Sequence, residues 1–208
     1  MIVLDFGSGE TCQNNIDIVH DMIDHLAAVD TRRQHVIIKW QLFREVPANC
    51  LPLTPSVFAD AVRYAHRKHY WTTASVFDEP SLQFLLDYQP PFVKIAARPE
   101  LYRLLDKIPP EVSVFVSIPP GFDKETLINQ YPNVKVLHCV PEYPANPTIY
   151  ETSFGGNLHY SISDHTTDFY LYHKYQPYFY ECHYKLGTST GLDSGPFART
   201  PKDLAAIL

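Results

Sequence analysis

The sequence lacks the features that mark several common classes of protein. No stretch approaches the ~18 consecutive apolar residues of a transmembrane helix, and no long basic run occurs in a chain with 17 basic and 23 acidic residues. The formal charge of −6 also opposes a general nucleic-acid-binding surface. The opening MIVLDFGSGE has no positively charged start, so we expect no signal peptide. From these absences we expect that the protein binds neither a membrane nor a nucleic acid.

Cysteine and glycine patterns exclude further classes. The four cysteines, at positions 12, 50, 139 and 182, include no C-x-x-C pair. This predicts a reduced, cytoplasmic chain in which the thiols are small buried apolar groups. Only 8 glycines are present, and no predicted strand is followed by G-x-G-x-x-G or G-x-x-x-x-G-K-[ST]. The usual nucleotide-binding fingerprints are therefore absent.

What the chain does have is a regular alternation of short apolar runs and helical patterns. Its 208 residues, 45% of them hydrophobic, suffice for one domain over residues 1–208. The predicted strands cover residues 2–6, 35–43, 70–77, 92–97, 112–118, 134–140, 157–164 and 178–185. Helical spacing separates most of them, although the Pro-rich stretch 141–156 is a poor helix. Eight βα units favour a compact (β/α)8 TIM barrel over an open doubly wound sheet.

Polar side chains near the strand ends predict where a site would lie. In a (β/α)8 barrel the chemistry lies at the C-terminal ends of the strands, and a buried strand carries charge only for a reason. Lys39 and Lys94 lie at equivalent points of the second and fourth predicted strands. Each alone could be an outward lysine whose stem covers apolar surface. Together they could hold a phosphate or carboxylate at the barrel mouth.

Two histidines carry the sharpest hypothesis that the strands alone support. His165 and His183 lie at the ends of the seventh and eighth predicted strands, so they are expected to be neighbours. Converging neutral imidazoles can bind a divalent transition metal. Glu181 shares a face with His183 because strand side chains alternate with a period of two. The strands therefore indicate a small enzyme barrel for an anionic substrate, with or without a metal.

Seven segments, in order over nearly the whole chain, resemble the catalytic barrel of the sialic acid synthase family. YSISDHT (160–166) resembles the family's G-[YL]-S-D-H-T motif, and YECHYKL (180–186) resembles E-[KR]-H-F-T. The other matching segments are IIKWQLF (37–43), YWTTASVFDEPSLQFL (70–85), FVKIAARPE (92–100), LHCVPEYP (137–144) and GLDSGPFARTPKDLAAI (191–207). That family condenses phosphoenolpyruvate with an N-acylated amino sugar to make nonulosonic acids such as sialic acid.

The resemblance implies a role for each matched residue. His165 and His183 match metal ligands, usually of Mn²⁺. The residues that would hold the phosphate and carboxylate of phosphoenolpyruvate are Lys39, Lys94, Ser117 and Ser163, with Thr73 joining them. Those around the sugar and the reacting carbonyl are Gln41, Tyr143, Glu181 and Asp193, and Asp5 replaces a family glutamate. The implied catalytic set is Asp5, Glu181, His183 and Asp193.

The resemblance also implies a reaction. The metal would polarise the aldehyde of the open-chain sugar as a Lewis acid. C3 of phosphoenolpyruvate would attack that aldehyde carbon, water would add at C2, and phosphate would leave by cleavage of its C–O bond. The expected partners are therefore phosphoenolpyruvate and a sugar or another aldehyde.

Several departures from the family limit what this resemblance carries over. DFGSGETC stands where the family has E-I-G-x-N-H-x-G, so its Asn and His positions are Gly9 and Glu10. SIPPG keeps only Ser117 of S-T-G-M, and Ala97 replaces a serine. No segment matches the C-terminal antifreeze-like domain, so we expect the barrel alone, and any homodimer to form through it. The alternatives are another lyase or aldolase for a phosphorylated or keto-acid compound, or a non-catalytic binding barrel.

Overall fold

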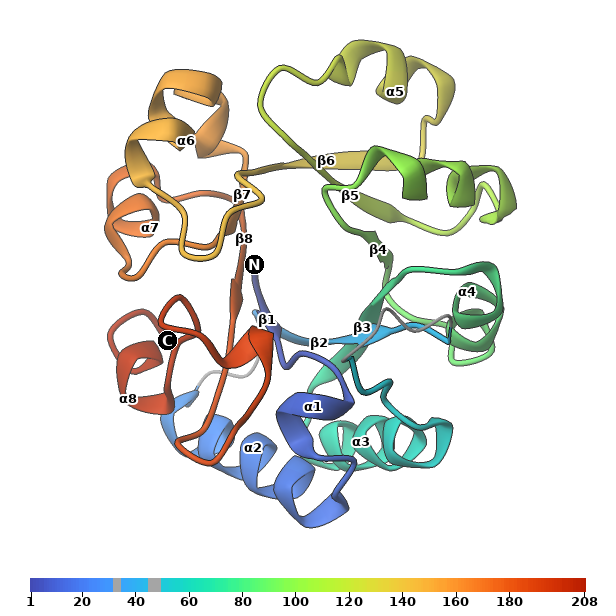
Figure 1. The fold of residues 1–208 in the computed structure, drawn as a ribbon, viewed down its shortest axis with the longest axis vertical. Helices are drawn as coiled ribbons and strands as arrows, with labels where there is room; N and C mark the ends of the chain where they lie inside the picture. The colour runs from blue at the N-terminus through green and yellow to red at the C-terminus, as the bar shows by residue number, and fades with distance from the viewer. Residues whose placement is uncertain (32–34, 45–49) are drawn as a thin grey trace.

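A computed structural model shows a closed barrel of parallel strands in the order β1 to β8, and it describes residues 1–31, 35–44 and 50–208. The strands surround a central interior and the helices lie outside them (Figure 1). Closure is direct, because Ile2 of β1 pairs with Val36 of β2 on one side and with Tyr180 of β8 on the other. The predicted (β/α)8 barrel is confirmed, and the open sheet is not formed.

The observed strands lie within the predicted apolar runs. They are β1 (Ile2–Asp5), β2 (Val36–Leu42), β3 (Trp71–Val76), β4 (Val93–Ile95), β5 (Val114–Ile118), β6 (Val134–Cys139), β7 (Ser161–Asp164) and β8 (Phe179–His183). The α-helices are α1 (Gly9–Cys12), α2 (Ile16–Val29), α3 (Pro55–Arg67), α4 (Glu79–Leu86), α5 (Lys124–Gln130), α6 (Pro147–Phe154), α7 (Tyr170–Tyr175) and α8 (Pro201–Leu204). The 3₁₀ helices are η1 (Pro99–Lys107), η2 (Gly155–His159) and η3 (Leu192–Ser194).

Helix starts follow from local capping chemistry. The Thr54 side chain accepts from the backbone N–H of Val57 at the start of α3, and Pro55 occupies the first turn. Thr200 and Asp203 form a reciprocal capping box that begins α8. Helix α2 buries an apolar stripe against the barrel, made of Val19, Met22, Ile23 and Leu26.

Three connections differ from the prediction. The stretch after Pro99 is a 3₁₀ helix rather than an α-helix. The predicted seventh strand is shorter, because residues 155–159 form η2 before β7 begins at Ser161. The Pro-rich stretch does contain a helix, α6, because Asn146 caps it and Pro147 lies in its first turn, where a missing N–H costs nothing.

The core has two parts separated by the barrel wall. The larger part lies between the strands and the surrounding helices. The smaller fills the barrel interior and consists of Val3, Ile37, Phe92, Phe115, Leu137 and Phe179. The rings of Phe115 and Phe179 stack with centroids 4.0 Å apart. This packed plug fills the barrel interior below the C-terminal ends of the strands.

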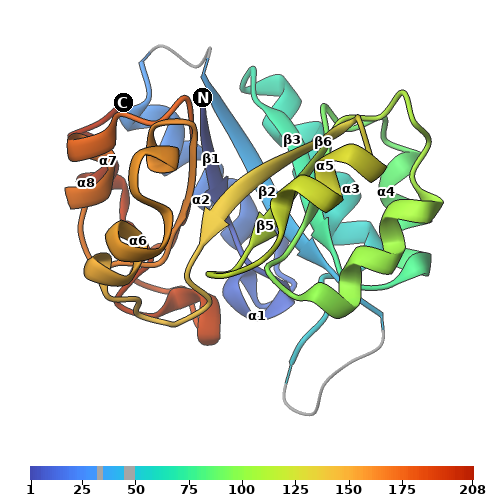
Figure 2. The ribbon, with the colours of Figure 1, turned by 90° about the horizontal axis from the view of Figure 1, so that it is seen from above.

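The described residues contain no helix that is long and apolar enough to cross a membrane. Cys12, Cys139 and Cys182 are buried free thiols, as predicted, whereas Cys50 is exposed. Both chain ends lie at the same end of the barrel (Figure 2).

Candidate active site

A pocket of about 120 Å³ lies at the C-terminal ends of the strands, directly above the apolar plug. Nearly all of the predicted site residues line it: Asp5, Lys39, Gln41, Lys94, Ser117, Tyr143, Ser163, His165, Glu181, His183 and Asp193. They come from seven strands or from the turns that follow them. The barrel therefore gathers side chains that lie up to 188 positions apart (5 and 193) in the sequence.

Lys39 is buried in an ion pair inside the barrel. Its side chain is 2% exposed, and its Nζ donates to Asp5 Oδ2 at 2.6 Å and to Ser75 Oγ at 2.9 Å. Burial alone would lower the pKa of Lys39, but the carboxylates of Asp5 and Glu181 outweigh it and raise this pKa. Burial would raise the pKa of Asp5, yet Lys39 and then His183 hold it well below its usual range. Both groups of this pair are therefore charged.

Lys94 is equally buried but less well compensated. Its side chain is 2% exposed, and its Nζ donates to Ser117 Oγ at 2.7 Å and to the Ile95 carbonyl at 3.0 Å. The nearest carboxylate oxygen, Glu181 Oε1, lies 3.6 Å away. Burial dominates and lowers the pKa of Lys94 despite the attraction of Glu181. An additional anion near this ammonium would stabilise its charged form.

Glu181 lies between the two lysines. Its Oε1 accepts from Ser163 Oγ at 2.9 Å and lies 3.9 Å from Lys39 Nζ. The neighbouring strands set this contact, because Ser163 of β7 pairs with Glu181 of β8. Its Oε2 is buried without a hydrogen-bond partner in the described ranges. A buried carboxylate oxygen in that state is free to accept a proton or a hydrogen bond from a bound molecule.

The two histidines converge as predicted, with ring centroids 5.3 Å apart. His165 Nδ1 lies 2.8 Å from the Val140 carbonyl. Burial, followed by the neighbouring His183, lowers the pKa of His165 to about 3, so its imidazole is neutral. His183 Nε2 lies 3.8 Å from Asp5 Oδ2, and its Nδ1 lies 3.3 Å from Asp193 Oδ1.

Their nitrogen atoms fit a divalent transition metal, although they do not form a complete cage. No group of three or more His, Cys, Asp or Glu side chains in the described part of the chain is arranged to hold a metal ion. His183 Nδ1 is nevertheless buried and makes no hydrogen bond within that part, although Asp193 Oδ1 lies 3.3 Å away. The backbone contact of His165 through Nδ1 leaves Nε2 as its donor atom. Two imidazole donors suit a metal whose other positions hold water or substrate.

Aromatic side chains form a wall around the histidines. The Tyr143 ring lies 4.2 Å from the His165 ring and 5.9 Å from the His183 ring, measured between centroids. Phe197 lies 4.9 Å from His183 and 5.0 Å from Tyr143. This apolar wall fixes the orientation of both imidazoles and restricts water around them.

Asp193 and Gln41 line the pocket close to His183 and Asp5. Gln41 Nε2 donates to Asp193 Oδ1 at 2.9 Å and to Asp5 Oδ2 at 3.0 Å. Burial raises the pKa of Asp193 above its ordinary value, and the effect of His183 does not fully offset it. Gln41 thereby links the two carboxylates that approach His183.

Thr73 is the predicted site residue that the structure places elsewhere. Its hydroxyl donates to the Phe92 carbonyl, and Thr73 does not line the pocket. Ser75, two positions later on the same face of β3, lines it instead and contacts Lys39. The resemblance of residues 70–85 to the family did not show which of these two hydroxyls reaches the pocket.

Arg98 and Phe77 were missed from the sequence. Both line the pocket, and the Arg98 guanidinium carbon lies 5.5 Å from the Phe77 ring centroid. Their positions could have indicated a place in the site, because Phe77 follows the end of β3 and Arg98 lies in the turn after β4. Arg98 lies within the matching segment 92–100, but the resemblance implies no role for it.

Buried polar side chains outside the pocket stabilise the segments that carry its residues. Tyr180 donates to Asp164 Oδ2 at 2.6 Å, and Arg199 Nη2 lies 3.5 Å from that same oxygen. Arg199 also bonds backbone to backbone with His183 and Lys185. The backbone bonds join the segment that carries Phe197 to the end of β8, where His183 lies. The contact with Asp164 joins it to the end of β7, next to His165.

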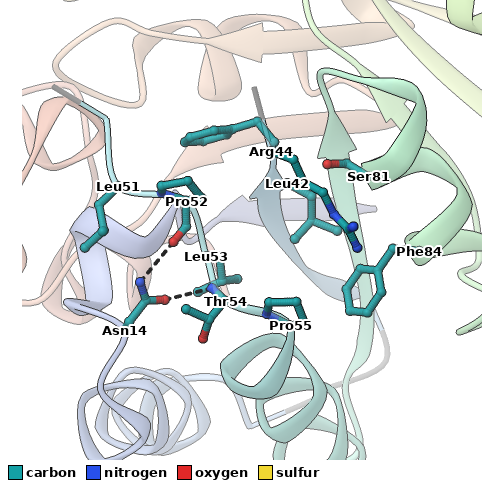
Figure 3. A pocket seen from close by; sticks show the side chains of 11 residues that line it. Asn14, Leu42, Arg44, Leu51, Pro52, Leu53, Thr54, Pro55, Ser81 and Phe84 are labelled. Carbon is teal, nitrogen blue, oxygen red and sulfur yellow. Dashed lines mark hydrogen bonds between the residues drawn. The ribbon is translucent and has the colours of Figure 1, made fainter. Parts of the chain in front are cut away.

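A larger cavity of about 460 Å³ lies beside α1 and the start of α3 (Figure 3). Figure 3 shows Asn14 bonded to the Pro52 carbonyl and to the Thr54 N–H, while Arg44 extends toward Phe84. Most of its lining is apolar, and it contains none of the predicted site residues. Size alone therefore does not locate the chemistry, and the smaller charged pocket is the candidate active site.

Comparison with known proteins shows similarity in structure alone. No family model and no curated protein matches the chain. The N-acetylneuraminic acid (sialic acid) synthetase of Leptospira borgpetersenii serovar Hardjo-bovis superposes with a TM-score of 0.78 at 18% identity, over 99% of this chain and 80% of that one. The spore coat polysaccharide biosynthesis protein SpsE of Bacillus subtilis gives 0.75 at 18% identity, over 99% and 65%.

A third structure extends this similarity. The truncated 3-deoxy-D-arabino-heptulosonate 7-phosphate synthase of Thermotoga maritima superposes with a TM-score of 0.69 at 12% identity, over 99% of this chain and 83% of that one. The shared feature is the fold. At these identities, function must be argued from the site itself.

Proposed function

We propose that the pocket binds phosphoenolpyruvate and condenses it with an aldehyde, releasing phosphate, in the biosynthesis of a sialic-type sugar acid. The observation that carries this proposal is the buried pair of lysines, Lys39 and Lys94, on either side of Glu181. Two ammonium groups, with the hydroxyls of Ser117 and Ser163, suit a small ligand that carries both a phosphate and a carboxylate. The structural similarity to sialic acid synthases supports the same reading.

In this proposal, the histidine side of the pocket receives the aldehyde. A divalent metal held by His165 and His183, with Mn²⁺ as our candidate, would polarise the aldehyde oxygen. C3 of phosphoenolpyruvate bonds to the aldehyde carbon, and water adds at C2. The water oxygen becomes the new keto oxygen after the C–O bond to phosphate breaks. Its two protons end on the new hydroxyl and on phosphate.

Each side chain has a role in the proposed reaction that follows from its charge and position. Lys39 and Lys94 offset the charge of the ligand and of the departing phosphate. Glu181 Oε2, which lacks a partner in the described residues, can take a proton from the attacking water. Asp5 and Asp193 approach the two nitrogens of His183 and orient its ring.

Calorimetric titration of phosphoenolpyruvate, with and without Mn²⁺, tests this proposal. We expect saturable binding that Mn²⁺ strengthens in the native protein but not in His183→Ala. Phosphate release with a panel of aldehydes then tests the reaction. Failure to bind at millimolar phosphoenolpyruvate, with no uptake of Mn²⁺, would contradict the proposal.

Lys94 carries a second candidate function. A buried lysine whose pKa is lowered by desolvation can attack a carbonyl as a neutral amine and form a Schiff base. A lyase or aldolase acting on a keto acid would use Lys94 in this way. Borohydride reduction in the presence of pyruvate distinguishes the candidates, because only the Schiff-base enzyme gains the mass of the reduced adduct on Lys94.

A further inference from the structure

Arg98 extends the positive side of the pocket beyond the two buried lysines. It lies in the turn after β4, beyond Ala96 and Ala97, and its exposed side chain lines the pocket with its guanidinium carbon 5.5 Å from the Phe77 ring centroid. A cation–π contact with a ring uses none of the guanidinium N–H groups, so these can still donate hydrogen bonds to a ligand. Ala96 and Ala97 line the adjoining wall with methyl groups, so Arg98 supplies the charged side chain of this turn.

Among the described residues, the carboxylates of the pocket pair with groups other than Arg98. Asp5 lies 2.6 Å from Lys39 Nζ, and Glu181 lies 3.6 Å from Lys94 Nζ. Asp193 approaches His183 at 3.3 Å. Arg98 makes no ion pair with a carboxylate in the described part of the chain. A guanidinium held on a ring at a pocket rim, without an acidic partner, is suited to an anionic group of a ligand.

We infer that Arg98 selects an acceptor aldehyde that carries its own anionic group, a phosphate or a carboxylate, remote from the reacting carbon. This inference rests on the proposed function, in which phosphoenolpyruvate occupies the lysines and serines deeper in the barrel. The second substrate then lies between the histidines and the rim, and its tail reaches Arg98. Neutral aldehydes lack that contact and bind more weakly.

Binding of unreactive acceptor mimics tests the inference without turnover. Glycerol 3-phosphate, glycerate and glycerol carry a phosphate, a carboxylate and no charge, and none has an aldehyde. Each is titrated into protein saturated with phosphoenolpyruvate, as the native chain, Arg98→Gln and Arg67→Gln. Arg67 is the matched control, because it is an exposed arginine 4.9 Å from the Tyr64 ring on α3 and does not line the pocket.

The expected result is selective. The native protein binds at least one anionic mimic more tightly than glycerol, and Arg98→Gln weakens that binding about tenfold, whereas Arg67→Gln does not. The tighter of the two anionic mimics identifies the phosphate or the carboxylate as the recognised group. Equal binding by the two variants would overturn the inference. So would an equal loss of phosphoenolpyruvate binding in Arg98→Gln, which would assign Arg98 to the first substrate.

Failure of the proposed function gives a different result. If phosphoenolpyruvate does not bind the native protein, that function is contradicted, and the same mimics are titrated without it. A tenfold difference between Arg98→Gln and Arg67→Gln would then still support an anion site at Arg98. No difference would overturn it.

Discussion

The barrel interior has two layers of side chains, an apolar lower level and a polar upper level. Their residues lie two positions apart along the same chain segments. The lower level is the apolar plug of Val3, Ile37, Phe92, Phe115, Leu137 and Phe179. Two positions later along the same chain segments lie Asp5, Lys39, Lys94, Ser117, Cys139 and Glu181, all of which line the pocket. A step of two keeps a side chain on the inner face of its strand. The change from apolar to polar therefore occurs at a single level.

The difference between the levels separates folding from function. The lower level gains stability from close packing of large rings. In the upper level, charges have been removed from water, and their mutual attraction offsets this cost only in part. The lowered pKa of Lys94 shows that the attraction of Glu181 does not fully offset the cost of burying this ammonium group. We therefore expect substitutions below to affect stability. Substitutions above should affect ligand binding, and should affect stability only where they leave a buried charge without its partner.

The largest expected effect comes from opening the lower level. Phe115→Ala removes a ring that stacks on Phe179 at 4.0 Å and packs against Phe92 at 4.8 Å. It should lower the free energy of unfolding by about 3–5 kcal/mol. Urea unfolding followed by circular dichroism measures it. A loss below about 1 kcal/mol would show that the plug does not support the barrel.

Breaking the buried ion pair tests the upper level. Lys39→Met leaves the Asp5 carboxylate buried without its ammonium partner and should cost about 3 kcal/mol. The double variant Lys39→Met/Asp5→Asn should recover most of that loss, because both charges are then absent. The two unfolding curves measure the coupling. Equal stability of the single and double variants would contradict a charged pair at this place.

The metal proposal predicts an effect on binding with little effect on the fold. His165→Ala and His183→Ala should each weaken Mn²⁺ binding at least about tenfold, as loss of one of two protein ligands requires. Calorimetric titration of Mn²⁺ measures this, with His138→Ala as control. His138 is also buried, but it contacts the Ser161 carbonyl and does not line the pocket. Unchanged Mn²⁺ affinity in both variants would contradict the assignment.

The smallest expected effects separate the two hydroxyls of β3. Ser75→Ala removes a partner of Lys39 and should weaken phosphoenolpyruvate binding by a factor of about 3–10. Thr73→Val removes the hydrogen bond to Phe92 and should lower stability by about 1 kcal/mol without affecting that binding. Calorimetric titration of phosphoenolpyruvate and urea unfolding of both variants measure these two effects. The reverse pattern would restore Thr73 to the site.

The sequence predicted the barrel and most of the pocket because both depend on regular features. Alternating apolar runs and helical patterns fix the order of the strands. Charged residues inside apolar runs, such as Lys39 and Lys94, mark the inner face near the strand ends. The resemblance in motifs then associated Lys39 with a histidine more than 120 positions away, His165.

Features that depend on how the strands and turns are placed relative to one another could not be predicted from the sequence. Whether Thr73 or Ser75 reaches the pocket depends on its height along the inner face of the barrel. The stacking of Arg98 on Phe77 joins two separate turns, and no local pattern encodes it. The pairing of Lys39 with Asp5 rather than with Glu181 depends on differences of about one ångström, 2.6 against 3.9 Å.

One variant tests the central claim, that charge in the upper level serves a ligand rather than the fold. Lys94→Met should weaken phosphoenolpyruvate binding at least about tenfold. The free energy of unfolding should meanwhile change by less than about 1 kcal/mol or increase, because Glu181 keeps its contacts with Ser163 and Lys39. The exposed Lys135→Met is the control for both measurements. A Lys94→Met protein that binds phosphoenolpyruvate as tightly as the control would contradict the account.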